Sequence, residues 1–223
     1  MSEIGRRMTS TPTLETPRLL LRPLELADAP RLQLLFPHWE IVRYLAVQVP
    51  WPYPPDGAYR YIRDMALPSI ERGETWQWPL RLKTSPDQII GSIDLRTKEN
   101  DNRGFWLALP WQRQGLMTEA CEAVTDFWFN TLNFPVLRAP KAVANIASRR
   151  ISEKQGMRLV ATEYRNYVSG RFPAEIWEIT AEEWRARRRY VLPPLKLLTL
   201  PSFCFHLMFA YHQRLLRDLA TRL

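Results

Sequence analysis

The residues best suited to bind an anion lie in one stretch, Gly104–Ala120, which reads GFWLALPWQRQGLMTEA. Its first part, Phe105–Leu109, is apolar and is bounded by glycine and proline, as is typical of a buried strand. A polar turn follows, and Thr118 can then cap a helix that continues at apolar helical spacing to Leu132. Because the first amides of a helix lack partners and lie at its positive end, the stretch predicts an anion site.

The turn between that strand and that helix carries groups suited to a phosphate. Gly115 lets the backbone approach a phosphate closely, and Arg113 adds a positive charge nearby. We expect the contacts to come from the whole turn, namely Gln112, Arg113, Gln114, Gly115, Leu116 and Met117.

A second polar stretch, Asn145–Met157, begins with asparagine and serine and has glycine at position 156. Asparagine and serine bond the first amides of helices, and glycine commonly follows a helix end. Taken alone, this stretch predicts a capped helix and no particular function.

Together the two stretches resemble the GCN5-related N-acetyltransferases (GNATs), whose Gln/Arg-x-x-Gly-x-Gly/Ala turn cradles the pyrophosphate of coenzyme A. Gln112 and Gly115 match this pattern, whereas Met117 stands where the family usually has glycine or alanine. The phrase ETPRLLLRPLELADA, which begins at Glu15, and the stretch Asn145–Met157 resemble the RimJ/RimL-type branch. The resemblance covers residues 13–184, and we expect these to form the acetyltransferase domain.

The resemblance implies an α/β (α+β) fold with a central mixed, mostly antiparallel sheet flanked by helices. It also implies acetyl-coenzyme A as cosubstrate, with direct transfer to a primary amine in a ternary complex. The pantetheine arm would pair with the central strand at Trp106 and Leu107, where a β-bulge would expose backbone donors. Asn145 would contact the arm, and Ser148 would be the general acid toward the departing thiolate. Bonding the start of its own helix is an equally good role for Ser148.

The general base is not identified by spacing. Relatives that use a glutamate place it just before a hairpin, where this chain has Asn166 beside Tyr167. An α-amine titrates near ~7.7–8.0 and a lysine near ~10.4, so an undefined base favours an N-terminal α-amine or another amine of low pKa. The other carboxylates considered are Glu40, Asp94, Glu163 and Glu175.

Three functions stay open at this point. In the first, the acceptor is a protein N-terminus. In the second, it is a small amine such as a polyamine, amino acid or antibiotic, and the protein is a detoxifying enzyme. A non-catalytic acyl-CoA-binding protein is the third, suggested by Met117 and by the undefined base. The aromatic, proline-rich stretch His38–Pro55 would line the acceptor cleft by resemblance, or would otherwise be an irregular loop.

Composition limits the class of protein. A chain of 223 residues that is 46% hydrophobic can bury one substantial core. Two cysteines and three widely spaced histidines predict no disulfide framework, no metal site and no Ser-His-Asp centre. Cys121 is expected to be a buried small hydrophobe rather than an acetyl carrier. Met1–Gly5 starts no apolar run, so we expect a cytoplasmic protein without a secretory signal.

The net charge of +8 is concentrated at the C-terminus, with +5 from Ala181 onward. The mildly basic body does not argue for nucleic acid as a partner. Residues 185–223 form an apolar and basic extension whose uninterrupted apolar part is shorter than the about 20 residues of a membrane span. We expect docking on the domain or contact in a homodimer. Binding to a membrane surface and partial disorder are the alternatives.

Overall fold

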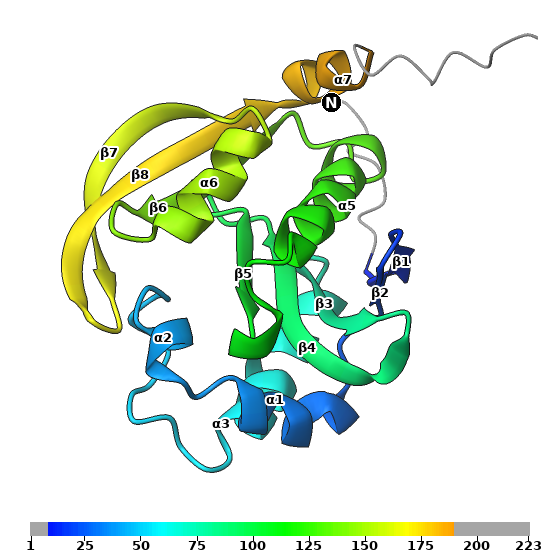
Figure 1. Cartoon of the computed structure of the whole chain (residues 1–223), viewed down its shortest axis with the longest axis vertical. Helices are drawn as coiled ribbons and strands as arrows, with labels where there is room; N and C mark the ends of the chain where they lie inside the picture. The colour runs from blue at the N-terminus through cyan, green and yellow to red at the C-terminus, as the bar shows by residue number, and fades with distance from the viewer. Residues whose placement is uncertain (1–8, 190–223) are drawn as a thin grey trace, which may run out of the picture. The chain divides into compact units, whose positions relative to one another are not determined.

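The structure, a computed structural model, describes residues 9–189, of which residues 9–184 belong to one compact unit (Figure 1). The expectations for the tail beyond residue 189 therefore lie outside the described residues. No helix among residues 9–189 is long and apolar enough to cross a membrane.

Two antiparallel sheets form the framework, and the predicted mostly antiparallel α/β fold is confirmed. The first has the order β1-β2-β3-β4-β5, with strands Leu14–Glu15, Leu19–Leu21, Thr75–Leu82, Ser85–Arg96 and Arg103–Leu107. The second has the order β6-β8-β7, with β6 at Val136–Ala142, β7 at Arg158–Tyr167 and β8 at Gly170–Thr180. The sheet is thus divided between β5 and β6.

Helices connect and cover the strands. The N-terminal half has η1 (Leu26–Asp28), α1 (Ala29–Leu35), α2 (Trp39–Val42), and the consecutive segments α3 (Gly57–Arg60), η2 (Tyr61–Ala66) and α4 (Leu67–Glu71). The C-terminal half has η3 (Leu109–Trp111), α5 (Leu116–Asn130), α6 (Ile146–Lys154) and α7 (Ala181–Arg189). Asp56 followed by apolar residues at helical spacing predicts a helix to Glu71, and the α3–α4 run matches this prediction.

The main core lies between α5 and the five-stranded sheet. Trp76 of β3 contacts the rings of Phe127, Trp128 and Phe134 edge-on, with centroids 6.3–6.4 Å apart. Cys121 is wholly buried in this core, as expected of a small hydrophobe. Burial of such large rings supplies much of the free energy that holds α5 on the sheet.

Several predicted boundaries are wrong. The apolar run between Glu15 and Pro23 predicts a single strand closed by proline, but the structure forms two short strands, β1 and β2. Ser85, Pro86 and Asp87 are typical turn residues, but the turn lies at Lys83–Thr84. The central strand ends at Leu107, because Leu109–Trp111 forms a 3-10 turn.

Pro140 predicts a break in the strand that starts at Val136, but β6 continues through it to Ala142. The bonds from Ala181 N–H to the Pro135 carbonyl and from Val143 N–H to the Pro173 carbonyl show that odd-numbered residues of β6 bond β8. Pro140 is even-numbered, so its backbone faces the edge of β6 away from β8. Its lack of an N–H therefore removes no hydrogen bond to β8.

Candidate functional site

The helix α5 starts at Leu116. The sequence predicts a start two residues later, at Thr118. Gly115 is the cap residue, with φ of 77° and ψ of 0°. Its carbonyl accepts the Glu119 N–H at 3.1 Å, so helical bonding begins there. The cap makes no side-chain hydrogen bond, and the amides of residues 116–118 precede the first helical bond.

The turn before α5 projects from the fold as an exposed loop, from Gln112 to Gly115. Arg113 also has a positive φ, 62°, which is uncommon for a residue other than glycine. Left-handed residues followed by helical ones aim successive N–H groups to one side, which makes a concave anion site. This backbone geometry suits an anion, and the anion site itself stays a prediction.

The side chain of Met117 does not cover this turn. Met117 and Leu116 are both buried in the main core, with exposed fractions of 7% and 2%. Only the backbone of Met117 remains on the turn. Its size therefore does not narrow the anion site, which removes the sequence-based reason for suspecting impaired binding.

Arg18 supports the turn, although sequence reasoning did not single it out. Its Nη1 donates to the Gln114 carbonyl at 2.9 Å, and its Nε donates to Glu119 Oε2 at 2.6 Å. A Cβ placed on Gly115 would lie 3.5 Å from its Nη2. The N-terminal segment thus brings a second cation, besides Arg113, to the mouth of the anion site.

Glu119 holds this arrangement together. It accepts from the Thr16 hydroxyl at 2.5 Å and from the Arg18 N–H at 2.8 Å, besides the guanidinium. Partial burial alone would raise the pKa of Glu119, but these hydrogen bonds outweigh it and lower the pKa. The carboxylate is therefore ionised at neutral pH.

Replacing Glu119 by glutamine should loosen the turn. We expect a loss of roughly 1–3 kcal/mol in the free energy of unfolding at neutral pH, since charge-assisted hydrogen bonds are lost. Because the folded pKa is lowered, the difference from the parent protein should shrink as pH falls below about 4. Urea unfolding between pH 3 and pH 7, with exposed Glu99→Gln as control, measures it. A difference that does not vary with pH would contradict the assigned charge.

The edge of β5 that faces β6 is open. The β4–β5 pairing is bounded by two backbone hydrogen bonds, from the Arg96 N–H to the Asn102 carbonyl and from the Ala108 N–H to the Ile90 carbonyl. Since bonding alternates along an antiparallel strand, Gly104 and Trp106 bond β4, whereas Phe105 and Leu107 face β6. The register has no shift, so the predicted β-bulge is absent from this pairing.

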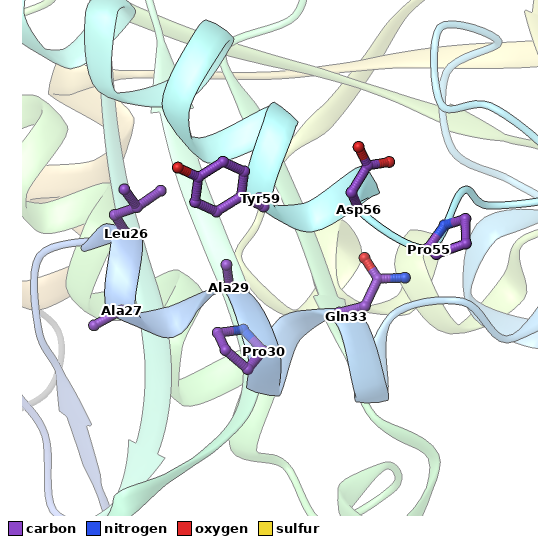
Figure 2. Close-up of a pocket in the computed structure, with 8 residues that line it drawn as sticks. All are labelled: Leu26, Ala27, Ala29, Pro30, Gln33, Pro55, Asp56 and Tyr59. Atoms are coloured by element: carbon purple, nitrogen blue, oxygen red, sulfur yellow. The ribbon is translucent and has the colours of Figure 1, made fainter.

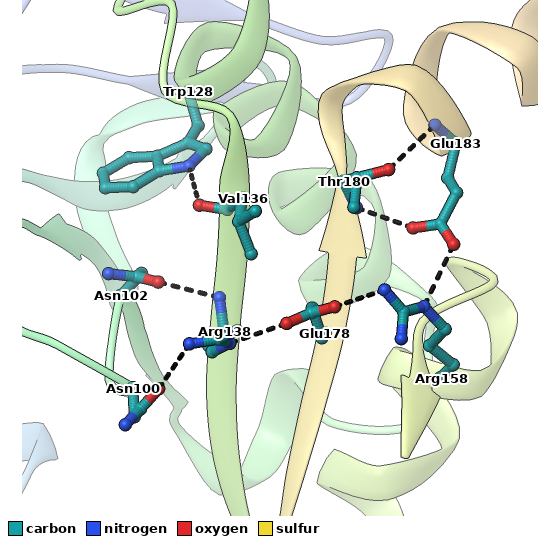
Figure 3. A network of polar contacts seen from close by, with 9 residues as sticks. All are labelled: Asn100, Asn102, Trp128, Val136, Arg138, Arg158, Glu178, Thr180 and Glu183. Carbon is teal, nitrogen blue, oxygen red and sulfur yellow. Dashed lines mark hydrogen bonds and ion pairs between the residues drawn. The ribbon is translucent and has the colours of Figure 1, made fainter. Parts of the chain in front are cut away.

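Hydrogen bonds join the two sheets where Asn102, just before β5, lies beside Arg138 of β6. Asn102 donates its N–H to the Arg138 carbonyl and accepts the Arg138 N–H on Oδ1, both at 2.7 Å. Glu178 of β8 then pairs with Arg138 and Arg158, which fixes β6 against its own sheet (Figure 3). We call the pair of unpaired strand edges beyond this junction, Phe105–Leu107 and Pro140–Ala142, the β5–β6 split.

Some backbone groups in the split already have partners. The Leu107 carbonyl accepts Gln112 Nε2 at 2.8 Å, and the Ala142 carbonyl accepts the Asn145 N–H at 2.8 Å. Alternation leaves the Phe105 N–H and carbonyl, the Leu107 N–H, the Pro140 carbonyl and the Ala142 N–H facing the split. An extended chain with amide groups is complementary to such a pair of edges.

Asn145 and Ser148 lie at the start of α6, directly after β6. Asn145 Oδ1 accepts the Ser148 N–H at 3.2 Å, so the predicted cap is confirmed and belongs to Asn145. Ser148 is buried, with an exposed fraction of 7%. Both residues follow the end of β6, at the same end of the split as the turn that follows β5.

Trp106 turns its side chain away from α5. Its ring contacts Phe36 edge-on at 5.3 Å, and Phe36 contacts Tyr53 at 5.0 Å. The aromatic stretch His38–Pro55 therefore reaches the opposite face of the sheet from α5. Ala46 also bridges to Tyr167, at the tip of the long β7–β8 hairpin seen in Figure 1.

The carboxylates considered as bases are largely engaged. Glu175 pairs with Arg149 at 2.6 Å, Asp94 with Arg96 at 2.9 Å, and Glu163 with Arg165 at 2.5 Å. Burial raises the pKa of Asp94 although Arg96 opposes it. The Tyr167 hydroxyl is buried without a hydrogen-bond partner, and burial raises its pKa to about 12. Tyr167 therefore stays protonated at neutral pH, and its hydroxyl is free to donate or accept a hydrogen bond but not to act as a base.

A shallow pocket of about 400 Å³ lies elsewhere, between η1–α1 and the start of α3 (Figure 2). Its polar groups are occupied, since Asp56 pairs with Arg60 and Gln33 bonds the backbone of Pro54 and Ala58. None of the predicted cofactor residues lines it. Within residues 9–189, no group of three His, Cys, Asp or Glu side chains is placed to hold a metal ion.

Comparison with known proteins identifies the family model that fits. Residues 18–158 match the acetyltransferase (GNAT) domain. No curated protein matches the chain.

Solved structures share the fold at low identity. The ribosomal-protein-S5-alanine acetyltransferase from Vibrio fischeri is 15% identical, with 77% of this chain and 98% of that chain covered and a TM-score of 0.64. RimL, a ribosomal L7/L12 α-N-protein acetyltransferase solved with coenzyme A, is 17% identical over 77% and 99%, with a TM-score of 0.63. MccE, a microcin C7 self-immunity acetyltransferase solved with acetyl-CoA and AMP, is 17% identical over 74% and 93%, with a TM-score of 0.62.

Proposed function

Because this chain belongs to the GNAT acetyltransferase family, it is an N-acetyltransferase, and we propose that acetyl-coenzyme A binds across the turn and the β5–β6 split. The pyrophosphate lies on the amides of Gln112–Met117, between the cations of Arg113 and Arg18. The observation that carries this proposal is the pair of unpaired strand edges on β5 and β6. The turn that forms the anion site follows β5, so the two features are adjacent. A coenzyme A arm offers an anion at one end and two amides along its length, which suits both features.

The pantetheine arm takes the place of a strand between β5 and β6. Its amides pair with Phe105 and Leu107 on one side and with Pro140 and Ala142 on the other. Trp106, named from the sequence, serves through its ring on the acceptor side, since its backbone bonds β4. Gln112 holds the Leu107 carbonyl, which leaves the neighbouring Leu107 N–H to polarise the thioester carbonyl.

The N-terminus of α6 completes the donor site. Asn145 and Ser148 border the split directly after β6, with the Ser148 hydroxyl as the general acid toward the departing thiolate. Replacement of Ser148 by alanine should slow transfer without weakening coenzyme A binding.

We propose an N-terminal α-amine as the acceptor, as in the RimJ/RimL-type branch. Three of the four carboxylates considered as bases are paired with arginines, so the acceptor must reach the site neutral. At pH 7 the neutral fraction of a lysine amine is roughly several hundred times smaller than that of an α-amine, given pKa values near 10.4 and 7.7–8.0. The similarity in fold to RimL and to the S5-alanine enzyme supports the same acceptor class.

An amine panel tests this proposal. The assay compares a peptide with a free N-terminus and a peptide whose N-terminus is acetylated and which contains one lysine. We expect a kcat/KM at least tenfold higher for the peptide with the free N-terminus. Polyamines and amino acids form the small-molecule arm of the same assay, read out as release of the thiol. Faster transfer to the lysine peptide or to a polyamine would overturn the α-amine proposal. Coenzyme A binding without turnover on any amine would favour the non-catalytic alternative.

A further inference from the structure

Lys141 is a buried lysine on the strand that borders the split. Its exposed fraction is 6%, and it lies on the face of β6 that also carries the buried Leu137 and Ala139. The side chain crosses toward β5, where Nζ lies 4.4 Å from the centroid of the Phe105 ring. Phe105 also contributes open backbone groups to the split. The amine therefore lies beside the place proposed for the inner end of the pantetheine arm.

No carboxylate among residues 9–189 pairs directly with this lysine, although the charge of Asp101 attracts it from farther away and favours the charged amine. Glu175 is directly opposite it on β8, but Glu175 accepts from Arg149 at 2.6 Å and from the Trp177 indole at 3.0 Å. Among the described residues, the contact of Nζ with the Phe105 ring is the one direct interaction that the structure gives it. Buried charges are otherwise paired or hydrogen-bonded, because desolvation is expensive. An amine left alone here calls for a functional explanation.

The surroundings favour the neutral amine. Burial, and next the nearby Arg103, lower the pKa of Lys141 from 10.5 to about 7. Arg103 is itself buried, bonded to Thr125 and Met157 rather than to a carboxylate. An arginine at position 141 would stay charged, whereas a lysine can lose its proton and become a nucleophile. The chain uses arginine at 26 of its 31 basic positions and lysine at five, so the choice at this position is notable.

We propose that Lys141 is a self-acetylation site, which takes the acetyl group from acetyl-coenzyme A bound in the β5–β6 split when no acceptor is present. This inference rests on the proposed donor site. The neutral Nζ attacks the thioester carbonyl, a C–N bond forms and the C–S bond breaks. One proton passes from Nζ to the departing thiolate, which leaves acetyl-lysine and free coenzyme A thiol. The step needs no further reactant, and its product keeps no charge in the buried site.

Mass spectrometry of the full-length protein tests the proposal. The protein is incubated with acetyl-coenzyme A and no amine, digested, and mapped at each lysine. We expect acetyl on Lys141 at least tenfold faster than on the exposed lysines Lys83, Lys98 and Lys154. Lys141→Met should lose this signal, and Lys141→Gln provides a second neutral variant should the first fold poorly. Acetyl on the exposed lysines at the same rate as on Lys141 would show chemical acetylation and overturn the proposal.

Two further measurements separate this inference from the donor site on which it rests. Coenzyme A binding is measured by calorimetry on the same protein, and its absence would overturn both. Binding together with an unmodified Lys141 would overturn self-acetylation alone. Acetyl on the buried Cys121 in place of Lys141, recognised by its cleavage with hydroxylamine, would also overturn it. A Gly115→Val variant, in which the anion turn is disturbed, should lose acetylation at Lys141 but keep any chemical background on exposed lysines.

Discussion

Replacing Gly115 by valine should weaken coenzyme A binding by at least about tenfold while the domain stays folded. The left-handed backbone at Gly115, with φ of 77°, costs a residue with a side chain roughly 1–2 kcal/mol, and a β-branched residue more. A loss of 1.4 kcal/mol in binding is about tenfold in affinity. The turn can relieve this strain only by moving the amides that start α5. Calorimetric titration with coenzyme A measures the change.

The control for this variant is Gly115→Asn. Asparagine tolerates the left-handed region, and a Cβ at this position meets nothing closer than Arg18 Nη2 at 3.5 Å. The asparagine variant should therefore keep its affinity within a few-fold of the parent. If valine and asparagine bind coenzyme A equally well, the backbone conformation of Gly115 does not build the donor site.

Replacing Arg81 by methionine should destabilise the domain by about 3–5 kcal/mol, the usual cost of removing one partner of a buried ion pair. Arg81 Nη2 donates to Asp28 Oδ1 at 2.6 Å, and the two side chains are only 9% and 10% exposed. Asp28 also accepts the Glu25 N–H at 3.0 Å, so the pair attaches the start of α1 to β3. Urea unfolding followed by tryptophan fluorescence measures the loss.

The matched control is Arg72→Met, which removes an exposed pair with Glu74, with side chains 57% and 44% exposed. We expect a change below about 1 kcal/mol there, because solvent screens exposed pairs. The double variant Arg81→Met, Asp28→Asn should recover part of the loss, since no unpaired charge remains buried. A cost for Arg81→Met as small as that of Arg72→Met would show that the Asp28–Arg81 pair does not hold α1.

The order strand, turn and helix around Gly115 could be predicted from the sequence because its causes are local. Apolar spacing, a glycine that accepts a positive φ and a capping asparagine at position 145 all act within a few residues of the backbone that they shape. Because local patterns do not report tertiary contacts, the predicted starts of β5 and α5 are each two residues too late. The burial of Leu116 and Met117 in the core decides where the helix begins, and no local pattern reports that burial.

What only the tertiary structure decided is which groups meet across long separations. Arg18 and Glu119 are 101 residues apart, so their support of the anion turn has no signal in spacing. Backbone bonding alternates with every residue, so the register with β4 decides that Phe105 and Leu107, and not Trp106, open toward the split. The pairing of Glu175 with Arg149 likewise leaves Lys141 without a directly paired carboxylate across the strands. The sequence thus determined the kind of site, and the pairing of distant strands determined which atoms face it.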